Sequence, residues 1–357
     1  MRRSWYLSKV VPSGQAEFIA NRLYARPKWI FKYLKRRLFT LLVYRMFGLV
    51  PELNKIADEH RSILWINWAA PSLGDSLMDL SARVLLDGRE VVLLTHLKNK
   101  TLFENDDYYS SVFSDYRELI AKYGKNYFDL VICDSYSPRV LFKKLAVAPF
   151  VPFVGLYGYL NGFEVHRTYF AFARMMELLA IEKLIYPIRP SISLHNELLN
   201  QRPEVDVCIA VGGEWPFRTY DQWCEVVSWL TEKGYSVSLV GSKNGVCDAS
   251  KILDNQPSVR STVSCSSLRE VCVEIAKAKI FIGADGGLWH IACAIPIPTV
   301  VLFADCQIFD EDGNRVTRET KDMICEILYD DVEVSNIPSS RVIEAFERLR
   351  KRVGLGS

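Results

Sequence analysis

Several large enzyme classes are disfavoured by motifs that this 357-residue sequence does not contain. No G-x-G-x-x-G follows an apolar run and no G-x-x-x-x-G-K-[ST] occurs, which argues against dinucleotide-dependent dehydrogenases and P-loop nucleotidases. The G-x-S-x-G turn of many serine hydrolases is absent too. The five histidines do not have the spacing of metal ligands, so the sequence predicts no metal site.

Cysteine is not scarce, but it lacks the pairing that a disulfide or zinc framework needs. None of the nine cysteines forms a Cys-x-x-Cys pair, and most lie in or beside apolar segments such as VCIAV and IACAI. The first apolar run of any length begins after residue 37, so no secretory signal peptide is expected. We therefore expect reduced thiols in the core of a cytoplasmic protein.

Acidic residues are almost missing from the first fifty positions. There, eleven Lys or Arg stand against one acid, Glu17, a net charge of +10, although the whole chain carries only +2. Aromatic residues interleave with the bases in RPKWIFKYLKRRLFTLLVYRMFGLV, residues 26–50. The apolar run over residues 38–50 is too short to span a bilayer, which needs about 20 residues.

This pattern is typical of a basic amphipathic helix that lies on an anionic membrane surface. We therefore interpret residues 1–50 as an arm that associates peripherally with the inner face of the cytoplasmic membrane. Two alternatives stay open: a helix packed on its own domain, and a nucleic-acid-binding arm. No nucleic-acid-binding motif appears elsewhere, so we expect no nucleic-acid partner.

After Pro51 the sequence alternates between short β-rich runs and longer helical ones. The expected strands of the first half are residues 62–68, 89–95, 128–134 and 149–155, with helices near 76–87 and 165–183. A polar, proline-containing stretch, residues 186–204, reads as a linker. The alternation then restarts with strands such as VDVCIAVGG, YSVSLVGS, KIFIGADGG and PTVVLF.

Strands that alternate with helices predict parallel sheets with right-handed crossovers, an α/β fold. We expect three parts: the arm 1–50, an N-terminal domain 51–190 and a C-terminal domain 191–357. Two similar α/β halves place the expected active site in a cleft between them, outside the carboxyl ends of their strands.

The first candidate site stretch is WINWAAPSLGDSLMDL, residues 65–80. A strand ends before Ser72, Gly74 allows a tight turn, and Asp75 is expected at the top of the sheet. Two roles for Asp75 stay open. It is either the N-cap of the following helix or a general base for a substrate hydroxyl.

The second and third stretches follow strands of the second half. In VGGEWPFRTYDQW, Gly212 and Gly213 expose backbone amides and Arg218 lies just before a helix, an arrangement that favours a diphosphate clamp or a surface arginine beside a structural turn. In FIGADGGLWHIACAI, Asp285, Gly286 and Gly287 form the turn before a helix whose N-terminus favours an anion. His290 lies in the first turn of that helix, as a core residue or a ligand contact.

Together the three stretches resemble glycosyltransferase family nine, the ADP-heptose:lipopolysaccharide heptosyltransferases. The resemblance covers about residues 60–305 and is carried by Ser72-Leu73-Gly74-Asp75, and by Asp285-Gly286-Gly287-Leu288-Trp289-His290 with the later Pro298-Thr299. The Gly212-Gly213-Glu214-Trp215 stretch is similar to the heptosyltransferase I branch, which adds the first heptose. Two positions depart from the family pattern: Gly286 replaces the usual Thr, and Arg218 is the nearest counterpart of the usual Lys.

The resemblance implies a GT-B fold, in which two Rossmann-like domains have parallel sheets that face each other across a cleft. It implies inverting transfer of a heptose from ADP-heptose to the inner-core Kdo of lipid A, without a metal or other cofactor. Asp75 would be the general base, with Ser72 and Gly74 on the acceptor side. The donor side would be formed by Gly212, Gly213, Arg218, Asp285, Gly286, Gly287 and His290.

Two alternative functions stay open. The same fold can use another nucleotide sugar for O-antigen or capsule, and a non-catalytic protein can bind nucleotide sugars. In all three cases the expected ligand is a nucleotide sugar, and an anionic lipid acceptor agrees with the basic arm.

Overall fold

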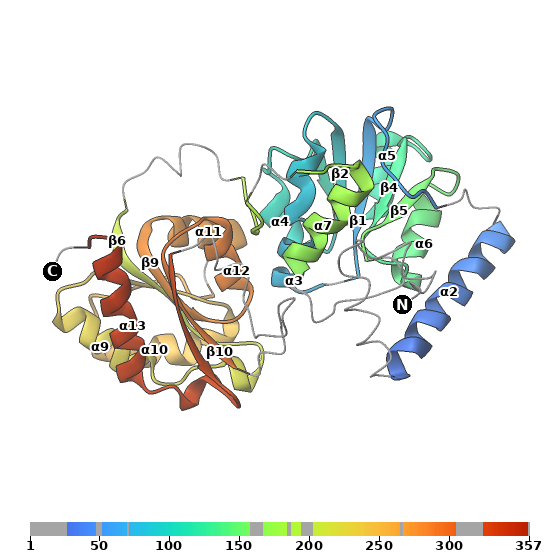
Figure 1. Ribbon diagram of the computed structural model, residues 1–357. Coiled ribbons are helices and arrows are strands. Elements are labelled where there is room, and N and C mark those ends of the chain that lie inside the picture. The colour runs from blue at the N-terminus through green and yellow to red at the C-terminus, as the bar shows by residue number, and fades with distance from the viewer. Residues whose placement is uncertain are drawn as a thin grey trace. The chain divides into compact units, whose positions relative to one another are not determined.

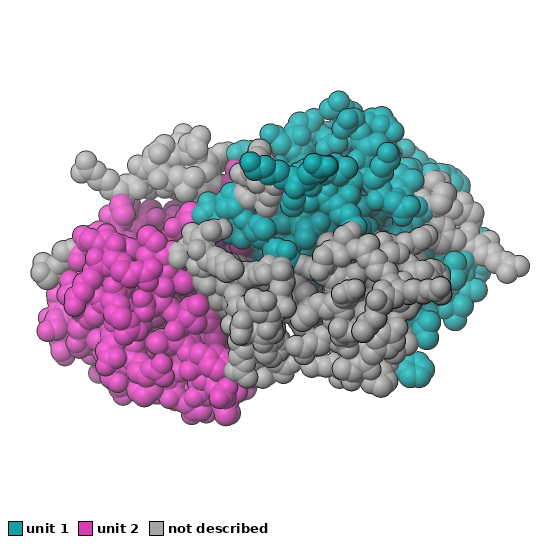
Figure 2. Space-filling view, in the orientation of Figure 1, with its two compact units in different colours: residues 1–189, 309–316 teal, residues 190–308, 317–357 magenta. Residues whose placement is uncertain are grey.

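The computed structural model describes residues 27–47, 52–69, 71–157, 167–183, 187–193, 203–264, 267–304 and 324–355 (Figure 1). These residues divide into two compact units, which meet in the sequence between Arg189 and Pro190 (Figure 2). The described part of the expected linker, residues 187–193 and 203–204, contains no helix or strand. The arm before residue 27 lies outside the described residues.

Unit 1 is built on a five-stranded parallel sheet. The strands follow the order β3-β2-β1-β4-β5. Their bounds are β1 Ser62–Asn67, β2 Glu90–Thr95, β3 Ser111–Phe113, β4 Leu130–Cys133 and β5 Phe153–Gly155. The strand expected over residues 149–155 is therefore limited to its last three residues, because the chain enters the sheet only after Pro152.

Helices cover both faces of this sheet (Figure 1). On one face α5 (Tyr116–Tyr123) and α6 (Pro138–Val147) share a core with the side chains of Leu64 and Ile66 from β1. The other helices are α3 (Leu73–Asp79), the 3-10 helix η1 (Ser81–Leu86), α4 (Leu97–Phe103) and α7 (Arg167–Leu179). Residues Ile63 to Ile66 are all fully buried, as a central strand covered on both faces requires.

A long helix, α2 (Pro27–Phe47), packs against α6 of unit 1. Its buried side chains recur at helical spacing, namely Tyr33, Arg36, Thr40 and Val43. Phe39 meets Phe142 of α6 edge to face, with 5.6 Å between the ring centroids. The helix of the expected arm therefore packs on its own domain through one face.

The outward face of α2 carries many exposed apolar side chains, with the exposed Lys35 among them, which is unusual for a solvent-exposed helix face. Phe31 and Met46 are 72% and 73% exposed. Four leucines lie between them on the same side and are also exposed: Leu34, Leu38, Leu41 and Leu42. Together these six residues form a strip, called here the outer α2 strip.

Unit 2 is built on a six-stranded parallel sheet, in the order β11-β10-β9-β6-β7-β8. Its strands are β6 Val205–Ala210, β7 Val237–Val240, β8 Arg260–Ser261, β9 Ala278–Ala284, β10 Thr299–Ala304 and β11 Cys325–Asp330. One face packs on α9 (Trp223–Glu232), α10 (Val246–Asn255) and α13 (Ser339–Arg352) in a shared core. The helices α11 (Leu268–Ala276) and α12 (Gly287–Ala294) contact β9 outside that core. The expected α/β architecture with two parallel sheets is confirmed.

Candidate functional site

Both sheets reverse their strand order at one point. In unit 1 the chain builds outward from β1 to β3, then returns to the other side of β1 with β4. In unit 2 the same reversal lies between β6 and β9. Open parallel sheets bind ligands outside the carboxyl ends of their strands at such a switch point. The predicted site residues follow β1, β6 and β9, so each unit has its candidate residues at this edge.

Asp75 lies in the first turn of α3, which begins at Leu73, three residues earlier than the sequence indicated. The N-cap is Ser72, whose hydroxyl accepts a hydrogen bond from the backbone N–H of Asp75 at 3.3 Å. The interpretation of Asp75 as the N-cap is therefore wrong, and its carboxylate stays 37% exposed. Gly74 lies inside the helix without a positive φ, so the expected glycine turn is wrong as well.

A buried network of charged and polar side chains lies next to Asp75. Arg167, the first residue of α7, donates to the carboxylate of Asp79 through Nε at 2.8 Å and Nη2 at 2.6 Å. The Tyr157 hydroxyl donates to the same carboxylate at 2.6 Å. The Arg167 Nη1 atom reaches Oδ1 of Asp75 at 3.5 Å. Arg167 thus joins an exposed carboxylate to a buried one.

Electrostatics keep this arginine charged. Burial alone would lower the pKa of Arg167, but the neighbouring Asp79, Tyr157 and Asp75 outweigh it and hold that pKa well above its usual value. No motif in the sequence singles out Arg167, Asp79 or Tyr157. Asp79 could have been found, because it lies four residues after Asp75 and therefore on the same face of a helix.

Asp134 is a second buried carboxylate at this edge, directly after β4. Its Oδ2 atom accepts hydrogen bonds from the backbone N–H groups of Trp68 at 2.7 Å and Ala69 at 2.6 Å. Burial raises the pKa of Asp134 to about 7, although these bonds oppose the shift. Asp134 therefore fixes the chain that leaves β1 on its way to Asp75. Local sequence patterns could not predict this contact, because it joins residues 66 positions apart.

In unit 2 the loops after β6 and β9 meet. Arg218, at the end of the 3-10 helix η2 (Pro216–Arg218), pairs through Nη1 with Oδ2 of Asp285 at 3.1 Å. His290 Nε2 lies 3.9 Å from the other oxygen of Asp285, and the imidazole is buried. The structure therefore brings Arg218, Asp285 and His290 together from two stretches of sequence. The Nε atom of Arg218 is buried and has no hydrogen-bond partner among the described residues.

The glycines at this edge serve different purposes. Gly212 has a φ of +79°, and a Cβ there would lie 2.6 Å from the backbone N of Gly245, so the loops after β6 and β7 approach closely only with glycine. At Gly213 a Cβ would lie 2.5 Å from Oγ1 of Thr219. Gly286 is extended, and a Cβ there would meet nothing closer than 3.9 Å. The space beside Gly286, at the start of α12, is therefore open.

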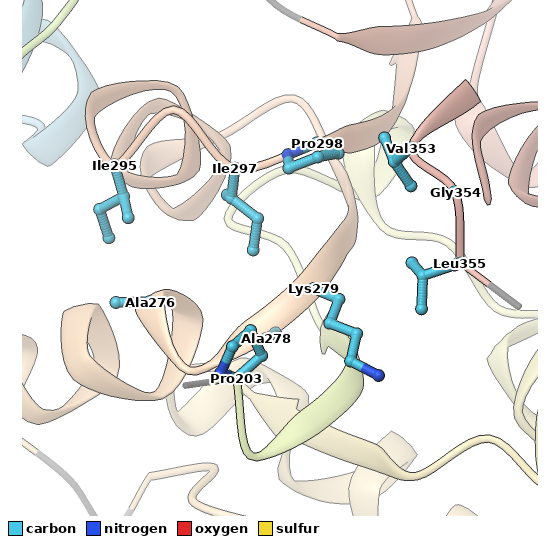
Figure 3. A pocket seen from close by; sticks show the side chains of 10 residues that line it. All are labelled: Pro203, Ala276, Ala278, Lys279, Ile295, Ile297, Pro298, Val353, Gly354 and Leu355. Carbon is cyan, nitrogen blue, oxygen red and sulfur yellow. The ribbon is translucent and has the colours of Figure 1, made fainter. Parts of the chain in front are cut away.

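A cavity of about 540 Å³ in unit 2 lies elsewhere (Figure 3). Its lining includes Pro203, Ala278 and Pro298, which precede or begin β6, β9 and β10. These positions mark the amino ends of the strands, opposite the edge that carries Asp285. Most of the lining is aliphatic, and its lysine, Lys279, is paired with Asp206 at 2.7 Å. This cavity is not the donor-side candidate.

Within the described residues, no group of three or more His, Cys, Asp or Glu is placed to hold a metal ion. No helix in the same part of the chain is both long and apolar enough to span a bilayer.

Comparisons with known proteins agree with this arrangement. Residues 165–308 match the family model of Glycosyltransferase family 9 (heptosyltransferase). No curated protein matches the sequence. Among solved structures, the glycosyl transferase family 9 protein from Veillonella parvula DSM 2008 has a TM-score of 0.65 at 13% identity, over 82% of this chain and 97% of that chain.

Two structures from E. coli are similar to the same extent. The ADP-heptose lps heptosyltransferase II has a TM-score of 0.63 at 17% identity, over 82% of this chain and 99% of its own. Heptosyltransferase WaaC with ADP-2-deoxy-2-fluoro heptose has a TM-score of 0.62 at 14% identity, over 80% and 99%. The family model thus supports the resemblance to family nine over residues 165–308, and the solved structures confirm the GT-B fold.

Proposed function

We propose that this protein is an inverting heptosyltransferase that moves a heptose from ADP-heptose to the inner-core Kdo of lipid A. Asp75 takes the proton from the acceptor hydroxyl, whose oxygen attacks the anomeric carbon of the donor. The bond between that carbon and the diphosphate oxygen breaks, and ADP leaves with the electron pair. The observation that carries this proposal is the exposed carboxylate of Asp75 at the switch-point edge, backed by Arg167.

A general base needs a free lone pair and a stable orientation. Arg167 touches only Oδ1 of Asp75, which leaves Oδ2 available to an acceptor hydroxyl. Ser72 caps the helix that carries Asp75, and Gly74 lies in its first turn, so both act by placing the base rather than by contacting the acceptor. These contacts support the assignment of Asp75 as the general base.

On the donor side, Arg218 and the start of α12 are the groups that stabilise charge on the departing diphosphate. The N–H groups at a helix N-terminus favour an anion, and the open space at Gly286 lets a phosphate approach them. Asp285 holds Arg218 in place, and His290 lies on the other side of that carboxylate. We assign Gly212 and Gly213 to the close approach of the neighbouring loops, and Gly287 to the start of the helix that faces the diphosphate.

We further propose that the protein works at the inner face of the cytoplasmic membrane, where an anionic lipid acceptor is found. The outer α2 strip supplies an apolar face to insert among lipid head groups. The sequence of α2 contains six Lys or Arg and no acid, which complements an anionic surface. A helix packed on α6 by one face and docked on lipid by the other unites two of the interpretations that the sequence left open.

Donor identity tests the proposal against its alternatives. A ligand that binds only the folded protein raises its melting temperature. We expect ADP-heptose to raise the melting temperature of this protein more than UDP-, GDP- or CMP-sugars do. A selective response to another nucleotide sugar would point to O-antigen or capsule synthesis, and no response to any of them would overturn the enzyme assignment of the site.

The role of Asp75 has its own test. Asp75→Asn keeps the size of the side chain and removes the base, so we expect transfer to fall by about 10² to 10⁴ with an unchanged melting temperature. Asp58→Asn is the matched control, because its side chain is fully exposed in the same unit. Near-normal turnover by a folded Asp75→Asn protein would remove Asp75 from the role of base.

Membrane docking is tested with vesicles of phosphatidylglycerol and phosphatidylcholine. The double variant Phe31→Ser/Leu38→Ser should bind about tenfold more weakly or worse, because each lost side chain removes buried apolar area. Leu97→Ser is the control, since Leu97 is 72% exposed in unit 1 but lies on α4. Binding should also weaken with salt. Equal binding by the double variant would contradict the assignment of this face.

A further inference from the structure

A group of basic side chains surrounds Trp68, directly after β1 at the switch point of unit 1. The Trp68 ring stacks on His96, with 4.3 Å between ring centroids and 30° between the planes. The ammonium of Lys143, on α6, lies 3.5 Å from the centroid of the same indole ring. His96 Nε2 lies 3.2 Å from the carbonyl oxygen of Trp68, so this nitrogen carries the hydrogen and donates.

More positive charge gathers around this stack. Arg139 precedes Lys143 by four residues on α6, which places both on one face of the helix. Lys98 lies in the first turn of α4, two residues after His96. Burial lowers the pKa of His96, and the charges of Lys98, Arg139 and Lys143 lower it further, against the bond to Trp68. Each of these cations therefore raises the local potential.

Among the described residues, two acids lie near this group, and each has other hydrogen-bond partners. Asp134 is buried beside the backbone of Trp68, and its Oδ2 atom already accepts two backbone N–H bonds. Burial lowers the pKa of Lys143, and Tyr116 and Asp115 oppose that shift. The Oδ1 atom of Asp115 already caps α5 by accepting from the N–H of Arg117 at 2.8 Å. Within the described residues Lys98, Arg139 and Lys143 form no ion pair. A fourth cation, Arg36 of α2, has its pKa lowered by burial; the charge of Asp134 opposes that shift, and the charge of Arg139 adds to it.

We propose that His96, Arg139 and Lys143 form an oxyanion-binding site that takes a carboxylate or phosphate of the acceptor. The loop from Trp68 leads to Asp75, and β1 and β2 are neighbours, so the site and the base share one edge of the sheet. An oxyanion there would pair with cations that form no ion pair with any acid among the described residues. The claim that the bound oxyanion belongs to the acceptor rests on the proposed function, whereas the affinity of the site for an oxyanion does not.

The test uses the full-length protein and NMR signals of the His96 ring. A bound oxyanion stabilises the protonated imidazole, so the apparent pKa of His96 must rise with a saturable dependence on the anion. Inorganic phosphate and acetate are the probes, at constant ionic strength set with chloride. We expect saturation by at least one of them. Preference for acetate assigns the site to a carboxylate, and preference for phosphate to a phosphoryl group.

Variants locate the binding. Arg139→Gln and Lys143→Gln should each lower the affinity for the anion about tenfold or more, because each variant loses a charge-assisted hydrogen bond. Lys125→Gln removes the same charge from an exposed turn of unit 1 and should change nothing. No saturable shift with either anion, or equal affinity in both variants, would overturn the site.

A sugar-transfer assay distinguishes a failure of this site from a failure of the proposed function. In the transfer assay Arg139→Gln should raise KM for the acceptor about tenfold and leave KM for the donor unchanged. A wild-type protein that transfers no sugar would refute the proposed function, while the anion titration would still decide the site. A wild-type protein that transfers sugar, with unchanged acceptor KM in Arg139→Gln, would refute a role of the site in acceptor binding.

Discussion

The pair between Arg167 and Asp79 predicts a large and pH-dependent loss of stability when only one partner is removed. Asp79 is 1% exposed and accepts two hydrogen bonds from Arg167 and one from Tyr157. Arg167→Met leaves this carboxylate buried with the tyrosine alone. Loss of one partner of a buried pair costs roughly 3–5 kcal/mol, and we expect about 3 kcal/mol here because Arg167 is 18% exposed.

The sign of the pH dependence follows from burial. Burial raises the pKa of Asp79, and Arg167 opposes that shift. Without the arginine, the folded-state pKa of Asp79 rises further above its unfolded value. The variant should therefore recover stability below about pH 4, where the unfolded carboxyl is protonated, and lose it as pH rises through the folded pKa.

A second substitution shows whether the loss of stability comes from the buried carboxylate that has lost its arginine. In Arg167→Met/Asp79→Leu no charge is left buried, and Tyr157 can still donate to the backbone oxygen of residue 167, 3.3 Å away. Stability should return to within about 1 kcal/mol of the wild type.

Urea unfolding at pH 7 and pH 4 measures these differences. The control is Lys100→Met, which breaks a surface pair with Glu104 in the same unit and should cost less than about 0.5 kcal/mol. A loss below about 1 kcal/mol in Arg167→Met, or a deficit that is equal at both pH values, would refute the reasoning.

Three other predictions follow from single contacts. Asp134→Asn removes a carboxyl group with a folded pKa of about 7, whose contribution to stability is lost as the pH rises from about 4 to 7. Over this range, the free energy of unfolding in urea should therefore fall by up to about 4 kcal/mol more in the wild type than in the variant. Parallel pH profiles of the two proteins would contradict this prediction. Gly212→Ala should lower the melting temperature more than Gly88→Ala, because both have a φ of +79° but only Gly212 has a neighbour within 4 Å; equal shifts would argue against the close approach of the loops. Arg218→Lys should raise the KM for the donor about tenfold at constant acceptor KM, because a lysine ammonium cannot replace the two parallel hydrogen bonds of a planar guanidinium. An unchanged donor KM would show that Arg218 does not bind the diphosphate.

Some features of this protein could be predicted from local sequence patterns. The alternation of apolar runs and helical stretches predicted both parallel sheets, because a strand covered on two faces needs a continuous apolar run such as SILWIN. The motifs around Asp75 and Asp285 predicted which turns lie at the carboxyl edges. The family model matches residues 165–308, which contain the motif around Asp285.

Other predictions failed where a neighbouring residue competed for a local role. Asp75 was a candidate N-cap, but Ser72 takes that position three residues earlier. Gly74 was expected in a turn, but it lies within the helix, because the cap at Ser72 makes the helix begin at Leu73. Local sequence could not choose between two capping residues three positions apart, since both have the side-chain oxygen that a cap requires.

The sequence by itself determined the fold class, the order of the strands' carboxyl-end turns and the excess of positive charge on α2, because these depend on residues close together in the chain. Only the tertiary structure decided that Arg167 stands beside Asp75, 92 positions away, and that Asp134 holds the loop after β1. It also decided which face of α2 is covered by α6 and which remains apolar and exposed. Such contacts arise from packing between elements, and no local periodicity specifies the partner that a charged or apolar side chain will meet.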